Sequence, residues 1–281
     1  MQFKITFGQL EEPPYTRYTT LYDVLNLVIG SFLVGLAWTI ATYRQVFDIY
    51  VIQNPLLAIN VKYLLFVAFP TAFLSLALHE LAHKLTASAL GYKSRIRISP
   101  LDIILGIITA YLFGFVIGAP LATEVAKGEK IEKRDLGLIA FAGPVVNILL
   151  ASVSYPFVED PYFSLLFALN FMLALTNLLP LPGLATDGTY MALYLEPKVF
   201  GISLPWLATT IPFVFLFMNN VDFLTYCITY SNIYFIAEFS QIQVTTPPIP
   251  LPTLKMLTGQ ATPIIIYFKL FRRKLPNWYR I

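Results

Sequence analysis

Ionisable side chains lie in one of the most apolar stretches of the chain, "LALHELAHKLTASAL" at positions 76–90. His79, Glu80 and His83 form the pattern HExxH, and the chain contains no histidine outside it. On a helix, residues four apart lie on the same face, so both imidazoles can bind one metal ion. Glu80, beside the first histidine, then has the position of a general base. The pattern therefore predicts a catalytic metal site.

Two hydrogen-bonded histidines that join neighbouring helices are the alternative interpretation of this pattern. A charge at the centre of a bilayer costs about 2.5–3.5 kcal/mol, so ionisable residues in such a stretch favour a function. We therefore expect zinc at His79 and His83. The neighbouring Lys84 is expected to extend its ammonium group toward the cytoplasmic surface, without a part in the chemistry.

A catalytic zinc ion with two histidine ligands needs a third protein ligand and an open position for water. The stretch "TNLLPLPGLATDG" at 176–188 supplies Asp187 after a break rich in proline and glycine. By itself, Asp187 would be interpreted as part of an Asp-Gly turn at a membrane boundary. Together with the HExxH pattern, it is the predicted third ligand. We expect one Zn²⁺ per chain, held by His79, His83 and Asp187.

The composition is that of a membrane protein. Of the 281 residues, 57% are hydrophobic and 12% are charged, whereas about 25% are charged in an ordinary soluble domain. The single cysteine excludes a disulfide within the chain and a zinc site made of thiolates. A net charge of +3 is too small to indicate a nucleic-acid partner, so the lipid bilayer is the expected surrounding.

Apolar stretches of about 20 residues predict six membrane-spanning helices. They lie at 21–42, 62–90, 136–157, 162–182, 198–219 and 221–241. A further apolar run, 98–122, is interrupted by prolines and glycines. The sequence thus predicts an all-α polytopic membrane protein with about six transmembrane helices.

Basic residues cluster in three places, and the positive-inside rule would put all three in the cytoplasm. The clusters are Lys93, Arg95 and Arg97; Lys127, Lys130, Lys133 and Arg134; and Lys269, Arg272, Arg273, Lys274 and Arg280. The run 98–122 would then start and end in the cytoplasm, which predicts a re-entrant hairpin between the second and third helices.

The same rule predicts the organisation of the whole chain. Six spans place both termini in the cytoplasm. We expect a cytoplasmic N-terminal segment at 1–20, a membrane-embedded metalloprotease domain at 21–241, and a Pro-rich, basic cytoplasmic tail at 242–281.

The motifs in this order resemble the site-2 protease family of intramembrane zinc metalloproteases. That family combines HExxH on one membrane helix with an asparagine–proline–aspartate–glycine motif on a later one. Asn177, Pro180, Asp187 and Gly188 are similar to the second motif, although Asp187 follows Asn177 by ten residues, two more than is usual in the family. "AGPVVN" at 142–147 resembles a third family element. The stretch 91–122 is similar to the family's re-entrant hairpin.

This resemblance, which covers 62–190, implies a zinc endopeptidase that cleaves membrane proteins within or near a transmembrane segment. Glu80 would be the general base. The substrate helix has to unwind locally, and Asn147, Asn177 and Pro180 are candidates for holding the unwound strand. For Asn147, a hydrogen bond between helices is an equally good interpretation.

Two other functions are alternatives to the protease. One is a metal transporter, which would need polar residues along several spans. The other is a catalytically inactive relative that only binds membrane proteins, which would not need Glu80. The concentration of polar residues at one depth and the presence of Glu80 favour the protease.

Overall fold

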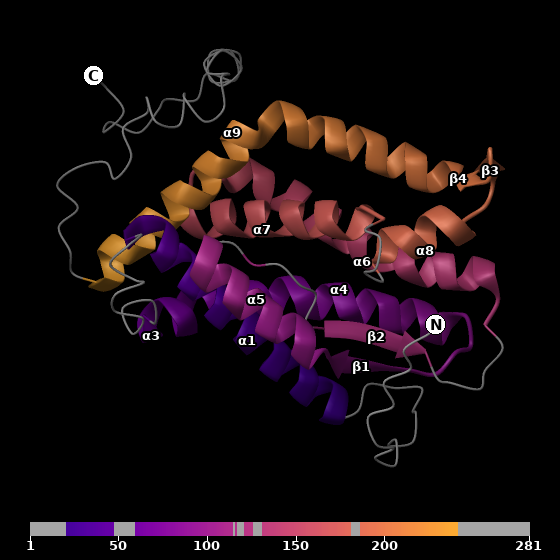
Figure 1. Ribbon diagram of the computed structural model, residues 1–281, viewed down its shortest axis with the longest axis horizontal. Helices are drawn as coiled ribbons and strands as arrows, with labels where there is room; N and C mark the ends of the chain where they lie inside the picture. The colour runs from indigo at the N-terminus through magenta and orange to yellow at the C-terminus, as the bar shows by residue number, and fades with distance from the viewer. Residues whose placement is uncertain are drawn as a thin grey trace.

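The structure is a computed structural model that describes residues 21–47, 60–114, 116, 121–125, 131–180 and 186–240. Helices make up most of this part (Figure 1). The expected N-terminal segment 1–20 and the tail 242–281 lie outside the described residues.

The elements follow one another along the chain in a simple order. They are α1 (Leu21–Phe47), α3 (Val61–Tyr63), the π-helical segment η2 (Leu64–Ala68), α4 (Phe69–Ala89), β1 (Ser94–Ile98), α5 (Pro100–Phe113), β2 (Leu121–Val125), α6 (Lys133–Ser154), the 3₁₀ segment η3 (Tyr155–Phe157), α7 (Pro161–Leu178), α8 (Asp187–Tyr194), β3 (Lys198–Val199), β4 (Ile202–Ser203) and α9 (Leu204–Ser240).

Five stretches of helix in the described residues are long and apolar enough to cross a membrane. They are Leu21–Gln45, Val61–Ala89, Lys133–Phe157, Pro161–Leu178 and Leu204–Ile236. These helices fit an integral membrane protein, as the composition predicts. Their number differs from the expected six because the last two predicted helices are joined.

Helix α9 covers most of both helices predicted at 198–219 and 221–241, but the stretch 198–203 forms the short strands β3 and β4 instead of helix. Helix α9 has 37 residues and would be about 55 Å long if straight, compared with about 30 Å for the hydrocarbon core of a bilayer. It bends at Asn220, whose φ of −129° and ψ of 20° are not helical (Figure 1). The side-chain amides of Asn219 and Asn220 each donate to a carbonyl oxygen one turn earlier, a local competition that is typical of helix bends. The sequence thus predicted the break but not the continuity.

The orientation of the termini depends on the number of spans. An even number of spans puts both ends of the chain on the same side of the membrane, whereas the described residues contain five candidate spans. The cytoplasmic placement of both termini therefore stays a prediction from loop charge.

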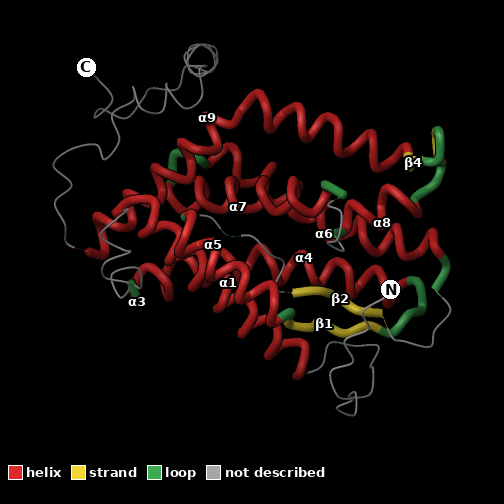
Figure 2. The backbone as a smooth tube through the Cα atoms, viewed as in Figure 1, coloured by secondary structure: helices red, strands yellow, loops and turns green. Residues whose placement is uncertain are grey.

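Between α4 and α6 the chain makes an excursion whose two ends lie together. Strands β1 and β2 pair antiparallel, with Ser94 opposite Val125 and Ile98 opposite Leu121 (Figure 2). The helix between them, α5, has 14 residues and is about 21 Å long, too short to cross the bilayer core. The excursion thus leaves from and returns to the same place. Its entry into a membrane stays a prediction, and the short strands are a departure from a purely helical fold.

Helix α4 lies in the middle of the arrangement. On one side it contacts α6 and α7, and on the other it contacts α1 and the β1–β2 hairpin (Figure 1). Gly35 of α1 allows a close approach, since a Cβ there would lie 2.9 Å from the backbone of Phe69. The helix that carries HExxH is therefore enclosed on two sides, and elements on both sides contact its polar residues.

Candidate metal centre

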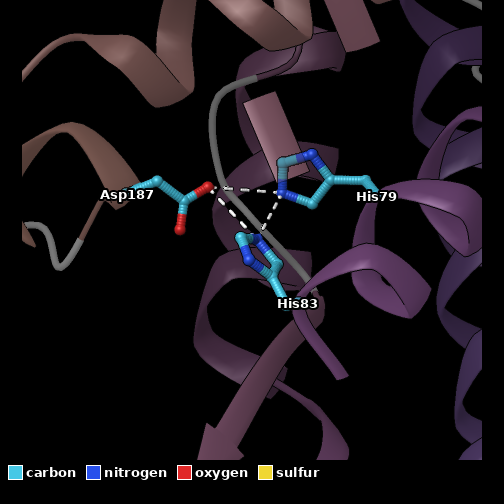
Figure 3. A group of neighbouring side chains, drawn as sticks. All are labelled: His79, His83 and Asp187. Atoms are coloured by element: carbon cyan, nitrogen blue, oxygen red, sulfur yellow. Dashed lines mark hydrogen bonds and ion pairs between the residues drawn. The ribbon is translucent and has the colours of Figure 1, made fainter. Parts of the chain in front are cut away.

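The two histidines of α4 converge on one point, as their spacing predicts. The Nε2 atoms of His79 and His83 are 3.0 Å apart, and both residues are 5% exposed (Figure 3). Their rings are nearly perpendicular, at 82°. Two imidazole nitrogens that face each other in this way can share one ion.

Asp187 comes from the opposite direction, in the first turn of the short helix α8 (Figure 3). Its Oδ2 atom is 3.3 Å from the Nε2 atom of each histidine. Close packing of α8 against the end of α7 brings it there, because Gly188 lies against the carbonyl oxygen of Leu178 without room for a side chain. The Thr186 hydroxyl also donates to the Leu179 carbonyl at 2.7 Å and joins the two ends of the intervening loop. The structure thus brings together the three predicted ligands.

The spacing of the three ligand atoms fits zinc. Zinc–ligand distances of about 2.0–2.2 Å put the corners of a tetrahedron about 3.3–3.6 Å apart. The two separations from Asp187 are 3.3 Å, at the lower end of this range, and the separation between the two histidine nitrogens is shorter, 3.0 Å. The donor set of two imidazoles and one carboxylate is also that of catalytic zinc sites, which keep a fourth position open.

Gly143 of α6 keeps the space beside these ligands free. A Cβ at this position would lie 2.6 Å from the Nε2 atom of His79 and would also collide with His83. The glycine of "AGPVVN" therefore has a steric reason: a larger residue would push into the volume that the ligand atoms face.

Neutral acceptors hold the other nitrogen of each ring. The Nδ1 atom of His83 is 2.6 Å from the carbonyl oxygen of Ile139, and the Nδ1 atom of His79 contacts the Oδ1 atom of Asn147. When Nδ1–H donates to these oxygens, the lone pair of Nε2 points toward the metal position. Such partners are the usual second layer of a metal site.

Asn147 lies between helices and hydrogen-bonds to two of them, and its predicted part in substrate binding stays a prediction. It is fully buried, its oxygen faces His79, and its amide nitrogen donates to the Oδ1 atom of Asn170 at 2.8 Å. Asn170 in turn donates to the Ser75 hydroxyl at 2.9 Å. These bonds join neighbouring helices, as in the alternative interpretation of Asn147. Asn170 thus links α7 to this chain of bonds.

Asn177 and Pro180 lie at the end of α7. The side-chain amide of Asn177 donates to the carbonyl oxygen of Leu173 in its own helix at 3.0 Å. Pro180 is exposed, and the five residues after it lie outside the described part of the chain. Neither residue belongs to the group of ligand atoms, and their part in substrate binding stays a prediction.

Glu80 is 3% exposed, and its Oε2 atom accepts a hydrogen bond from the Thr123 hydroxyl at 2.7 Å. At about 100° per residue, Glu80 projects about 60° around α4 from His83. The carboxylate thus faces the β1–β2 hairpin beside the ligands. The sequence around Thr123 gave no sign of this contact.

Lys84 does not extend toward a membrane surface as expected. It is 2% exposed, and its Nζ atom lies 2.9 Å from the Oδ2 atom of Asp23 and donates to the carbonyl of Ser94 at 2.7 Å. A carboxylate in α1 makes burial of the ammonium group tolerable. Asp23, an acidic residue at the start of an apolar stretch, was the available signal for such a pair.

Comparison of the chain with protein-family models, with curated proteins and with solved structures found no match. The functional argument therefore rests on the chemistry and geometry of the residues themselves.

Proposed function

We propose that this chain is an intramembrane zinc endopeptidase of the site-2 protease type, which hydrolyses peptide bonds within or near transmembrane segments of membrane proteins. The observation that carries the proposal is the group His79, His83 and Asp187, whose ligand atoms have zinc-like separations within a set of apolar helices. When bound there, zinc would supply a Lewis acid that polarises a carbonyl and acidifies water.

Each neighbouring residue has a part in this function. The Asn147 and Ile139 oxygens orient the two rings, and Asp187 completes the ligand set. Glu80 takes a proton from the attacking water while the oxygen of that water bonds to the carbonyl carbon of the peptide. Glu80 then returns the proton to the leaving amine when the carbon–nitrogen bond breaks. Of the three ligands, Asp187 has the greatest side-chain exposure, 18% against 7% and 6% for His79 and His83. We therefore place the approach of the substrate on its side.

The substrate must present an unpaired backbone. In a helix, each N–H and C=O is already hydrogen-bonded, so a transmembrane segment has to unwind locally before its carbonyl can reach the site. Membrane proteins whose transmembrane segment contains residues of low helix propensity are the substrates to try first.

Replacing Glu80 tests the function most directly. Glu80→Gln removes the base and keeps the size of the side chain and all three ligands. We expect zinc content to stay near one per chain, while the cleavage rate of single-span proteins by the purified chain falls by about 10²–10⁴. Glu159→Gln, which changes an exposed carboxylate away from the ligands, is the matched control and should cleave at the unaltered rate.

Other outcomes would point elsewhere. Cleavage by Glu80→Gln at the unaltered rate would refute the role of Glu80. Loss of zinc from that variant would make Glu80 a ligand or a structural residue and reopen the assignment of Asp187. A chain that binds zinc and membrane proteins but cleaves none of them would be an inactive relative.

We also propose that the excursion from β1 to β2 enters the membrane from the cytoplasm and returns to it. The antiparallel pairing of its ends and the basic residues beside them support this orientation. In a Cys227→Ser background, cysteines at the exposed positions Lys93 and Lys133 should react with a reagent from the cytoplasmic side, and one at Glu159 from the other side. Labelling of the first two positions from opposite sides would contradict a re-entrant excursion.

A further inference from the structure

The hydrogen bond to the Glu80 carboxylate comes from outside the helices that carry the ligands. Thr123 lies in β2, and its Oγ1 atom is 2.7 Å from the Oε2 atom of Glu80 and 3.3 Å from the Glu80 carbonyl oxygen. A hydroxyl has one hydrogen to donate, and the carboxylate oxygen is both nearer and charged, so it receives the stronger bond. The position of this carboxylate therefore depends on the position of β2.

The strand beside β2 is fixed to α1 by its backbone. Ile96 of β1, opposite Thr123 in the register, donates its N–H to the Oδ1 atom of Asp23 at 2.8 Å. Its carbonyl oxygen accepts from the Asn26 amide at 2.8 Å. Two side chains of α1 thus hold the edge of β1 that faces away from β2, and they fix the height of the hairpin along the helices.

Asp23 also contacts α4, at Lys84, one turn beyond Glu80. Asp23 pairs with Lys84 at 2.9 Å, and Lys84 also donates to the Ser94 carbonyl at the start of β1. A Glu and a Lys four residues apart on a helix are well placed to pair with each other. Here the lysine is bound by Asp23 and Ser94, and the glutamate receives a neutral hydroxyl instead of an ammonium group.

We propose that Thr123 is a positioning residue for Glu80: its hydroxyl holds the carboxylate beside the metal position, so that the β1–β2 hairpin sets where the base lies. That Glu80 acts as a base rests on the function proposed above, whereas the hydrogen bond between Thr123 and Glu80 does not. The hairpin would thereby have a task in catalysis besides its place in the membrane.

The test compares three variants of the full-length chain. Thr123→Val deletes the hydroxyl at nearly constant volume, and Thr123→Ser restores it. Thr109→Val is the control, since it removes another buried hydroxyl from the same excursion, one that donates to the Gly106 carbonyl of its own helix. A misplacement of about 1 Å can cost about 100-fold in rate. We expect Thr123→Val to lower kcat by up to about that factor with KM and zinc content unchanged, while Thr123→Ser and Thr109→Val keep most of the rate.

A thermodynamic cycle decides the contact without any activity measurement. Thr123→Val is introduced into the unaltered chain and into Glu80→Met, which lacks the carboxylate, and the midpoint of thermal unfolding is measured for each. A lowering of several degrees in the first background and little or none in the second supports the proposal, also if no substrate is ever cleaved. Equal lowering in both backgrounds, or equal rates for Thr123→Val and Thr123→Ser, would overturn it. Absence of cleavage by the unaltered chain, with the coupling intact, would count against the proposed function alone.

Discussion

The two sides of α4 hold ionisable residues in different ways. On the ligand side, which carries His79 and His83, neutral oxygens of Asn147 and Ile139 take one nitrogen of each ring. On the hairpin side, which carries Glu80 and Lys84, a buried ion pair holds the lysine and a hydroxyl holds the glutamate. On the ligand side both partners are neutral oxygens, whereas the hairpin side pairs Lys84 with a carboxylate and Glu80 with a hydroxyl.

The difference fits what each group would do in the proposed site. A histidine ligand must be uncharged and must direct one lone pair, so a neutral acceptor on its other nitrogen is sufficient. A buried ammonium group cannot lose its charge without cost and therefore needs a carboxylate. Neighbouring residues of one helix thus have different partners. Helices α6 and α7 contact one side of α4, and α1 and the β1–β2 hairpin contact the other.

Removing both ligands from α4 should have the largest effect on the ligand side. The double variant His79→Ala, His83→Ala leaves one carboxylate, which cannot hold zinc tightly. We expect about one zinc per chain in the unaltered protein and close to none in the variant, measured by metal analysis of purified, monodisperse protein. Equal zinc content in both proteins would show that His79 and His83 do not bind zinc, and would contradict a metal site on the ligand side.

Breaking the ion pair should have the next largest effect, on stability rather than on zinc. Lys84→Met removes the ammonium group beside the buried carboxylate of Asp23, which should cost about 3–5 kcal/mol in the free energy of unfolding. The double variant Lys84→Met, Asp23→Asn should recover part of this, because an amide oxygen can still accept from the Ile96 N–H.

The exposed pair of Arg97 and Glu124 is the control for the buried one. Their nearest atoms are also 2.9 Å apart, but the side chains are 44% and 38% exposed. Arg97→Gln should therefore change the free energy of unfolding by less than about 1 kcal/mol. Equilibrium unfolding in mixed micelles measures all of these variants, and a Lys84→Met variant as stable as Arg97→Gln would show that the hairpin side does not depend on charge pairing.

The smallest effect is expected from the amide beside His79. Asn147→Leu removes the acceptor for the Nδ1 hydrogen while all three ligands remain, and loss of such a partner typically weakens metal binding by about 10–100-fold. Zinc affinity should be measured by competition with a chelator. Asn177→Leu, which alters an amide that bonds within its own helix, should leave the affinity unchanged. Equal affinities for both variants would mean that Asn147 serves packing alone.

The sequence by itself determined what depends on local spacing. A spacing of four from His79 to His83 places both on one helix face, and the length of apolar runs predicts membrane helices, because both follow from the geometry of a single helix. The break near Asn220 is also local, since side-chain amides of consecutive asparagines compete with the helix backbone. Asp187 was found for a related reason: zinc chemistry requires a third ligand, and the chain offered a carboxylate in a suitable break.

Only the tertiary structure decided which distant residues meet. Lys84 pairs with Asp23, Asn147 bonds His79 and Asn170, and Thr123 reaches Glu80, each through contact between elements far apart in the chain. Burial removes water as a partner, so each polar group in the apolar interior must find a protein partner in whichever element packs against it. That choice depends on the packing of the helices and on the register of β1 and β2, neither of which a local pattern specifies.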